Sequence, residues 1–107
     1  MLLHCVFCAI RPDADPAELR SVMSELAALR TEVDGLLEFR HGPNLDYEHK
    51  SPRHGHGFVI AFRDRAAHLA YDVHPRHKAA GARLVDLCEG GYEGIVVYDL
   101  EAGTAGG

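Results

Sequence analysis

The pattern of hydrophobic positions changes several times along the chain, and each change predicts a different element. The segment Leu2–Ile10 is apolar at almost every position, which predicts a strand with two apolar faces. One face carries Leu3, Cys5, Phe7 and Ala9, and the other carries His4, Val6, Cys8 and Ile10. Both faces therefore need cover, and the helices of so short a chain can cover only one of them.

A helix is predicted to begin after Asp15. The Asp15 side chain can cap the first turn, Pro16 suits the first helical position, and Glu18 stands where a capping-box acid belongs. A single apolar stripe at helical spacing follows, made of Leu19, Val22, Met23, Leu26 and Leu29 or Arg30. Gly35 ends this segment.

Two further strands are predicted on either side of a long loop. The segment Leu36–His41 alternates between apolar and charged residues. Its two faces are expected to be Leu37 with Phe39, and Glu38 with Arg40. The stretch from Gly42 to Gly57 is rich in Gly, Pro and His, which predicts a loop. The next strand is predicted over His56–Arg63, with one face made of His56, Phe58, Ile60 and Phe62.

Two short helices and a last strand complete the chain. Asp64 can cap a helix that runs to about Val73. Pro75 breaks that helix and can start another over Arg76–Cys88. A final strand is predicted over Tyr92–Leu100, where apolar residues fill most positions.

The resulting order, β-α-β-β-α-β, predicts an α+β fold of the ferredoxin-like type. Its antiparallel sheet would carry helices on one side, so we expect a homodimer that buries the open sheet face and forms a dimeric α/β barrel. The 107 residues are too few for two cores, and one domain is predicted over 1–101. The small polar tail over 102–107 is predicted to be disordered.

Composition narrows the function classes. A net charge of −5 and the lack of any Lys- or Arg-rich window argue against nucleic acid as a partner. No apolar run is long enough to span a membrane, and the first residues do not resemble a signal peptide. Three cysteines cannot all pair within the chain, which predicts a cytoplasmic protein. Frequent Ala, Gly and Arg with only two Lys suggest a bacterial source.

Histidine is unusually frequent, with eight residues, and two groups of histidines are candidates for chemistry. His4 and His56 lie near the starts of strands that neighbour each other in this topology, so their rings can project from one face, or each can be an unrelated core histidine. The second group is Tyr71, His74 and His77 around the helix break. His77 in a first helical turn suits a neutral general base, and the Tyr71 phenol suits an oxyanion; an incidental polar break is the other interpretation.

A metal site is less favoured by the spacing. His54 with His56, and His74 with His77, offer imidazoles, but no acidic residue clearly completes a three-ligand set. We therefore expect no metal and no cofactor. The other histidines, His41, His49 and His68, are expected at the solvated surface.

The chain resembles the stress-responsive α/β-barrel (Dabb) domain family from Met1 to about Glu101. The resemblance rests on the opening Leu3-His4-Cys5-Val6, the Phe39-x-x-Gly42-Pro43-Asn44 turn, the His56–Phe62 strand, the Ala70-Tyr71-x-x-His74-Pro75-x-His77 segment and the closing Val96-Val97-Tyr98-Asp99. It implies a ferredoxin-like fold that dimerises face to face into a barrel. One characterised relative is a plant polyketide cyclase that forms olivetolic acid by a cofactor-free aldol cyclisation.

By this resemblance, His77 and Tyr71 are the predicted catalytic pair. The predicted substrate contacts are His4, His56, His74 and Phe58. The resulting hypothesis is cofactor-independent acid–base chemistry, a cyclisation or isomerisation of a β-keto or polyketide-like compound in a small apolar pocket. The alternative hypothesis is a non-catalytic, stress-responsive protein that binds a small apolar ligand in the same pocket. His54 and the glycines beside it depart from the family pattern, so the pocket mouth and the substrate are expected to differ.

Overall fold

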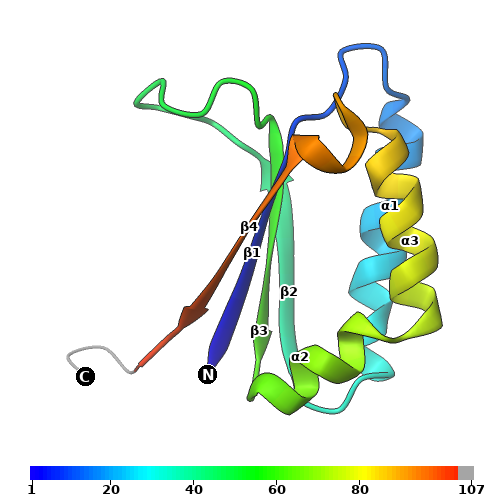
Figure 1. Ribbon diagram of the computed structural model, residues 1–107, viewed down its shortest axis with the longest axis vertical. Coiled ribbons are helices and arrows are strands. Elements are labelled where there is room, and N and C mark those ends of the chain that lie inside the picture. Colours follow the sequence, from blue (N-terminus) through cyan, green and yellow to red (C-terminus); the bar gives the residue numbers. More distant parts are fainter. Residues whose placement is uncertain (104–107) are drawn as a thin grey trace.

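The computed structural model describes residues 1–103 and has one four-stranded antiparallel sheet with three α-helices (Figure 1). The strands are β1 (Leu2–Cys8), β2 (Leu36–Pro43), β3 (His56–Phe62) and β4 (Ile95–Glu101). The helices are α1 (Pro16–Ala28), α2 (Arg65–Asp72) and α3 (Pro75–Asp86), with short 3-10 turns at Leu29–Thr31 and Gly91–Gly94. The strand order is β2-β3-β1-β4, which confirms the predicted ferredoxin-like fold with β1 and β3 at the centre.

The hydrophobic core lies between the sheet and the helices, which all cover the same face (Figure 1). Even-numbered residues of β1 point into this core, and they pair across to even-numbered residues of β3, so Val6 lies opposite Phe58. Helix α1 contributes the predicted stripe, in which Val22, Met23 and Leu26 are buried. The predicted cap is also present, since the Asp15 side chain accepts a hydrogen bond from the Ala17 backbone N–H at 2.9 Å.

The opposite face of the sheet carries no helix (Figure 1). Odd-numbered residues of β1 point to this side together with their cross-strand partners on β4, and among these Tyr98 is 58% and Leu100 is 53% exposed. The loop between β2 and β3 leaves the sheet on the same side. Asp46 holds this loop, because its side chain accepts hydrogen bonds from the backbone of Lys50 and Ser51. We refer to this side as the open sheet face.

Strand β2 departs from the predicted alternation. A bulge between Leu36 and Glu38 makes Leu36 a core residue, only 4% exposed, and leaves Leu37 at 46% exposed. The prediction that Leu37 shares a face with Phe39 is therefore wrong. The bulge lies just after Gly35, whose φ of +87° suits glycine. The Gly35 carbonyl accepts a hydrogen bond from the Arg63 backbone N–H.

The chain ends of the described part lie close together. The Ala102 N–H donates to the Met1 carbonyl at 2.8 Å, so the pairing of β1 and β4 extends one residue into the segment predicted as a tail. The rest of that prediction, residues 104–107, lies outside the described residues. No helix within residues 1–103 is long and apolar enough to cross a membrane.

Candidate active site

The break between α2 and α3 places Tyr71 and His77 against each other. The Asp64 side chain caps α2 by accepting from the Ala67 N–H at 2.9 Å, and the helix ends at Asp72. Tyr71 points inward from α2 and is 1% exposed, while His77 lies in the first turn of α3. Their ring centroids are 4.2 Å apart. The helix break therefore brings the predicted catalytic pair into contact.

The hydrogen bond of His77 defines its tautomer. Its Nδ1 lies 3.1 Å from the Asp72 carbonyl oxygen, which can only accept, so Nδ1 carries the hydrogen. In the neutral ring, Nε2 then holds a free lone pair and can accept a proton. Burial lowers the pKa of His77 below its ordinary value, against the opposing effect of the Asp72 carbonyl. The neutral form, which is the basic one, is therefore favoured near neutral pH.

The Tyr71 hydroxyl is buried without a hydrogen-bond partner among the described residues. Such an orphaned hydroxyl is costly, because it has lost its water without gaining a replacement. Burial, and then the nearby Asp72 carboxylate, raise the pKa of the Tyr71 phenol well above its usual range. The group is thus a neutral donor that no other protein atom uses.

His4 and Asp99 form the second part of the site. They are directly paired in the register between β1 and β4, on the face that points to the helices. The His4 Nδ1 lies 2.6 Å from Asp99 Oδ1, so the ring donates to the carboxylate and its Nε2 is left as an acceptor. The His4 ring is 6.0 Å from that of Tyr71, centroid to centroid. The site therefore includes residues of β1, β4 and α2.

His68 belongs to this site as well, and its prediction as a solvated surface residue is wrong. The ring is half-buried and lies 4.8 Å from the His4 ring, because His68 stands one helical turn before Tyr71 on the inner side of α2. Burial, and then the neighbouring His4, lower the pKa of His68. In the sequence, the three-residue spacing between His68 and Tyr71 could have placed both side chains on one face of the helix. Asp99 could have been found as an acidic residue on the same face of the last strand as Ile95 and Val97.

His56 lies at the other end of the same sheet face. The β1–β3 register sets it opposite Cys8, whereas His4 lies opposite Ile60. The two rings therefore share a face but are four positions apart. His56 instead meets His41, whose Nδ1 is 3.3 Å from the His56 Nε2. Burial, then His41, lower the pKa of His56.

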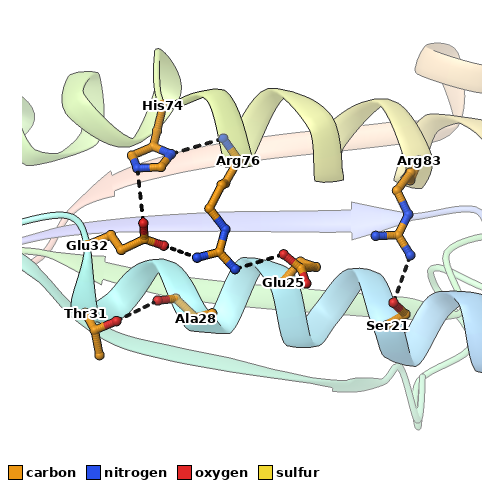
Figure 2. A network of polar contacts seen from close by, with 8 residues as sticks. All are labelled: Ser21, Glu25, Ala28, Thr31, Glu32, His74, Arg76 and Arg83. Carbon is orange, nitrogen blue, oxygen red and sulfur yellow. Dashed lines mark hydrogen bonds and ion pairs between the residues drawn. The ribbon is translucent and has the colours of Figure 1, made fainter.

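The side chains of Phe58 and His74 have partners other than the Tyr71 and His77 rings. Phe58 is buried and stacks on Phe39, with centroids 5.4 Å apart. His74 is the N-cap of α3, where its Nδ1 accepts from the Arg76 N–H at 3.1 Å and its Nε2 faces Glu32 at 3.9 Å (Figure 2). The substrate contacts predicted for His56, Phe58 and His74 stay predictions.

The surroundings of His74 tie α3 to α1. Figure 2 shows Arg76 reaching both Glu25 and Glu32, and Arg83 reaching Ser21. Arg83 also forms two hydrogen bonds with Glu18, whose pKa it lowers. These exposed ion pairs form a network that links α1 to α3. His74 takes part in this network through Glu32, which is a structural role.

A cavity of about 640 Å³ opens beside the His4–Asp99 pair. It is bounded by the start of β1, the turn after β3, the first turns of α2 and the end of β4. Its lining residues are Met1, Leu2, Arg63, Asp64, Arg65, His68, Leu69, Asp99 and Glu101. Thus His68 and Asp99 face the cavity, whereas Tyr71 and His77 lie behind them.

Comparisons with known proteins agree with this architecture. A dimeric ferredoxin-like protein of unknown function from Jannaschia sp. CCS1 is 44% identical, with 94% of this chain and 98% of that chain covered and a TM-score of 0.90. A hydroxynitrile lyase from Passiflora edulis is 16% identical, with 96% and 94% covered and a TM-score of 0.80. The Arabidopsis thaliana protein At3g17210 is also 16% identical, with 97% of each chain covered and a TM-score of 0.83.

At 16% identity, the last two likenesses show the fold alone. No protein of curated function matches the chain. The family model of the stress responsive A/B barrel domain, Dabb, matches residues 2–102. This match covers every strand and helix described above, so the chain belongs to the stress-responsive A/B barrel (Dabb) family.

Proposed function

We propose that this protein is an acid–base catalyst that removes a proton next to a carbonyl group of a small apolar substrate. In this proposal His77 Nε2 takes the proton and the Tyr71 hydroxyl donates a hydrogen bond to the enolate oxygen that forms. The step needs no cofactor, and it serves cyclisation or isomerisation of a β-keto or polyketide-like compound. The observation that carries the proposal is the buried, unpartnered Tyr71 hydroxyl beside a histidine whose free nitrogen is a base.

His4 acts in this proposal as a positioning residue for the substrate. Its Nδ1–H is held by Asp99, so its Nε2 has a fixed acceptor role toward the site. Tyr71 and His77 do not line the cavity, so the proposal includes an outward movement of α2 that lets the substrate reach them. Most of the α2 surface is exposed, with Ala67 and Tyr71 buried and His68 half-buried, which suits such a movement.

The test is proton exchange catalysed by the purified protein. The methyl protons of acetophenone in D₂O are followed by NMR, and cyanide release from mandelonitrile is followed in parallel because one structural neighbour is a hydroxynitrile lyase. Wild type is expected to accelerate at least one reaction, and Tyr71→Phe or His77→Gln to lose about 100-fold of that rate. His49→Asn, a change in the exposed loop, is the matched control.

Two outcomes contradict the proposal. Equal rates in wild type and both site variants would remove Tyr71 and His77 from the chemistry. If these compounds raise the melting temperature of wild type without any exchange or cyanide release, the protein is a non-catalytic ligand binder, as in the alternative hypothesis.

We also propose that the functional form is a homodimer formed through the open sheet face. The apolar side chains on that face support it, as does the 44% identical relative, which is described as dimeric. We expect light scattering to give twice 11.7 kDa for wild type and a monomer for Tyr98→Glu. Tyr92→Glu is the matched control, because Tyr92 is 78% exposed and lies outside the sheet. A dimer in the Tyr98→Glu variant would contradict this interface. We further propose a cytoplasmic location.

A further inference from the structure

We propose that His4, His68 and Asp99 form a binding site for one borderline divalent cation such as Zn²⁺. One ligating atom from each of the three side chains lies within 4.8 Å of the other two. These residues come from three elements, β1, α2 and β4, so the fold and not a local sequence motif brings them together. For this reason the spacing of histidines along the chain does not predict the site.

The donor set matches the chemistry of this class of cation. Two imidazoles and one carboxylate hold zinc in catalytic sites, where a fourth position stays open, and also suit other first-row divalent ions. Since Zn–N and Zn–O bonds are about 2.0–2.2 Å long, shifts of roughly 1 Å in these side chains would close the three atoms around one ion. Such shifts are small for His68 and Asp99, which are only partly buried.

The cavity determines what else can reach the ion. His68 and Asp99 both line the 640 Å³ cavity, so a cation between them would turn its open positions toward that space. The cavity also holds Arg63 and Arg65 together with Asp64 and Glu101, and Arg63 is paired with Asp34 and Asp64. The open positions of a borderline cation favour a ligand with oxygen donors, so we infer a small carboxylate or enolate as the second ligand.

In the metal-free site, a proton holds the place of the cation. The His4 Nδ1–H bridges to Asp99 Oδ1 at 2.6 Å, which is the contact that a cation would replace. When the ion binds His4 at Nδ1, the ring hydrogen has to move to Nε2, and Asp99 becomes a ligand. The two states are exclusive, and the cation therefore turns the His4 Nε2 from a hydrogen-bond acceptor into a donor.

The test is a Co²⁺ and Zn²⁺ titration of chelator-treated protein. Visible Co²⁺ absorption reports coordination by the chain, and calorimetry gives the Zn²⁺ stoichiometry. We expect saturation at one equivalent per chain. His68→Gln and Asp99→Asn are expected to lower the affinity for both ions at least about tenfold, because each substitution removes one of three ligands while roughly keeping the side-chain size. In nitrogen-detected NMR, Zn²⁺ is expected to shift the rings of His4 and His68.

Two controls separate this site from adventitious binding. His56→Gln breaks the other close histidine pair, and His49→Asn removes an exposed histidine; both are expected to keep wild-type affinity. Absent saturable binding, or binding that His56→Gln abolishes and His68→Gln does not, would overturn the proposal. The metal site shares His4 with the acid–base proposal but does not include Tyr71. Tyr71→Phe is expected to lose exchange activity and to keep metal affinity, so failure of one proposal is distinguishable from failure of the other.

Discussion

The two ends of the helix-covered sheet face each hold a pair of histidines, and the pairs differ in what surrounds them. At one end, His4 contacts Asp99 and His68, and the group continues to Tyr71 and a cavity. At the other end, His41 and His56 meet only each other, with Phe39 beside them. Both pairs have neighbouring rings, and a cavity of about 320 Å³ also lies beside His41, but among residues 1–103 only the first pair contacts a carboxylate and continues to the buried Tyr71 hydroxyl. Neighbouring imidazoles therefore become a candidate site through the groups that a third and a fourth element add.

The largest expected effect separates the two ends by rate. His77→Gln is expected to lower exchange activity about 100-fold, because glutamine cannot take up a proton at the position of Nε2. His41→Gln, at the other end, is expected to stay within about threefold of wild type, measured as the initial rate in the same NMR assay. A strong loss in the His41 variant would move the chemistry to the opposite end of the sheet.

The next largest expected effect is a difference in the free energy of unfolding between variants at the two ends of the sheet face. Asp99→Asn keeps a hydrogen-bond acceptor for His4 but removes its charge, so we expect a loss of about 1 kcal/mol in the free energy of unfolding. His41→Gln at the other end is expected to change the free energy of unfolding by less than about 0.5 kcal/mol, because the His41–His56 contact is exposed and includes no carboxylate. Urea titrations at pH 7.5 measure both, and equal losses would mean that the carboxylate adds nothing to the site.

The pH dependence is expected to follow the same division. Burial lowers the pKa values of His68 and His77 at the site and of His56 at the other end. The unfolded chain takes up protons near pH 6.5, before these folded groups do, so the stability contributed by these groups is complete above about pH 6.5 and is lost as the pH drops below it.

Replacing both His68 and His77 by Gln is expected to reduce this acid sensitivity more than His56→Gln does. Urea midpoints between pH 7.5 and 5 provide the measurement. Unchanged acid sensitivity in the double variant would show that the site histidines titrate alike in the folded and unfolded chain.

The smallest expected effect concerns the Tyr71 hydroxyl. Because that hydroxyl has no partner within residues 1–103, Tyr71→Phe is expected to leave stability unchanged or to raise it by up to about 1 kcal/mol. Thermal unfolding of the two proteins gives the difference. A clear loss of stability would mean that the hydroxyl already has a partner, and it would weaken its role as a free donor.

Much of the fold is predictable from local patterns in the sequence. Period-two alternation in β1 and β3, the cap at Asp15, the break at Pro75 and the order of elements each depend on neighbouring residues, and the structure confirms them. The bulge that exposes Leu37 depends on how β2 meets β3, which no local pattern encodes.

The candidate site is less predictable, because it depends on register and on contacts between distant elements. Tyr71 and His77 are six residues apart, and their proximity follows from the helix break. His4 and Asp99 are 95 positions apart and meet through the β1–β4 register. The same kind of constraint separates His4 from His56, since sliding β1 along β3 would bring them together only by breaking the pairing of Val6 with Phe58 in the core.

The central strand β1 has a further consequence for how this protein can change. Its even positions carry His4 and core residues, and its odd positions carry Leu3 and Cys5 on the open sheet face. Deletion of Cys5, with Val6 and Cys8 kept in the core, would turn the imidazole of His4 to the open sheet face and set Leu3 opposite Asp99. A substitution in β1 alters one face of the sheet, whereas a change of length between His4 and Val6 alters both faces. This part of the strand is therefore a place where sequence variants are expected to differ in residue type but not in residue number.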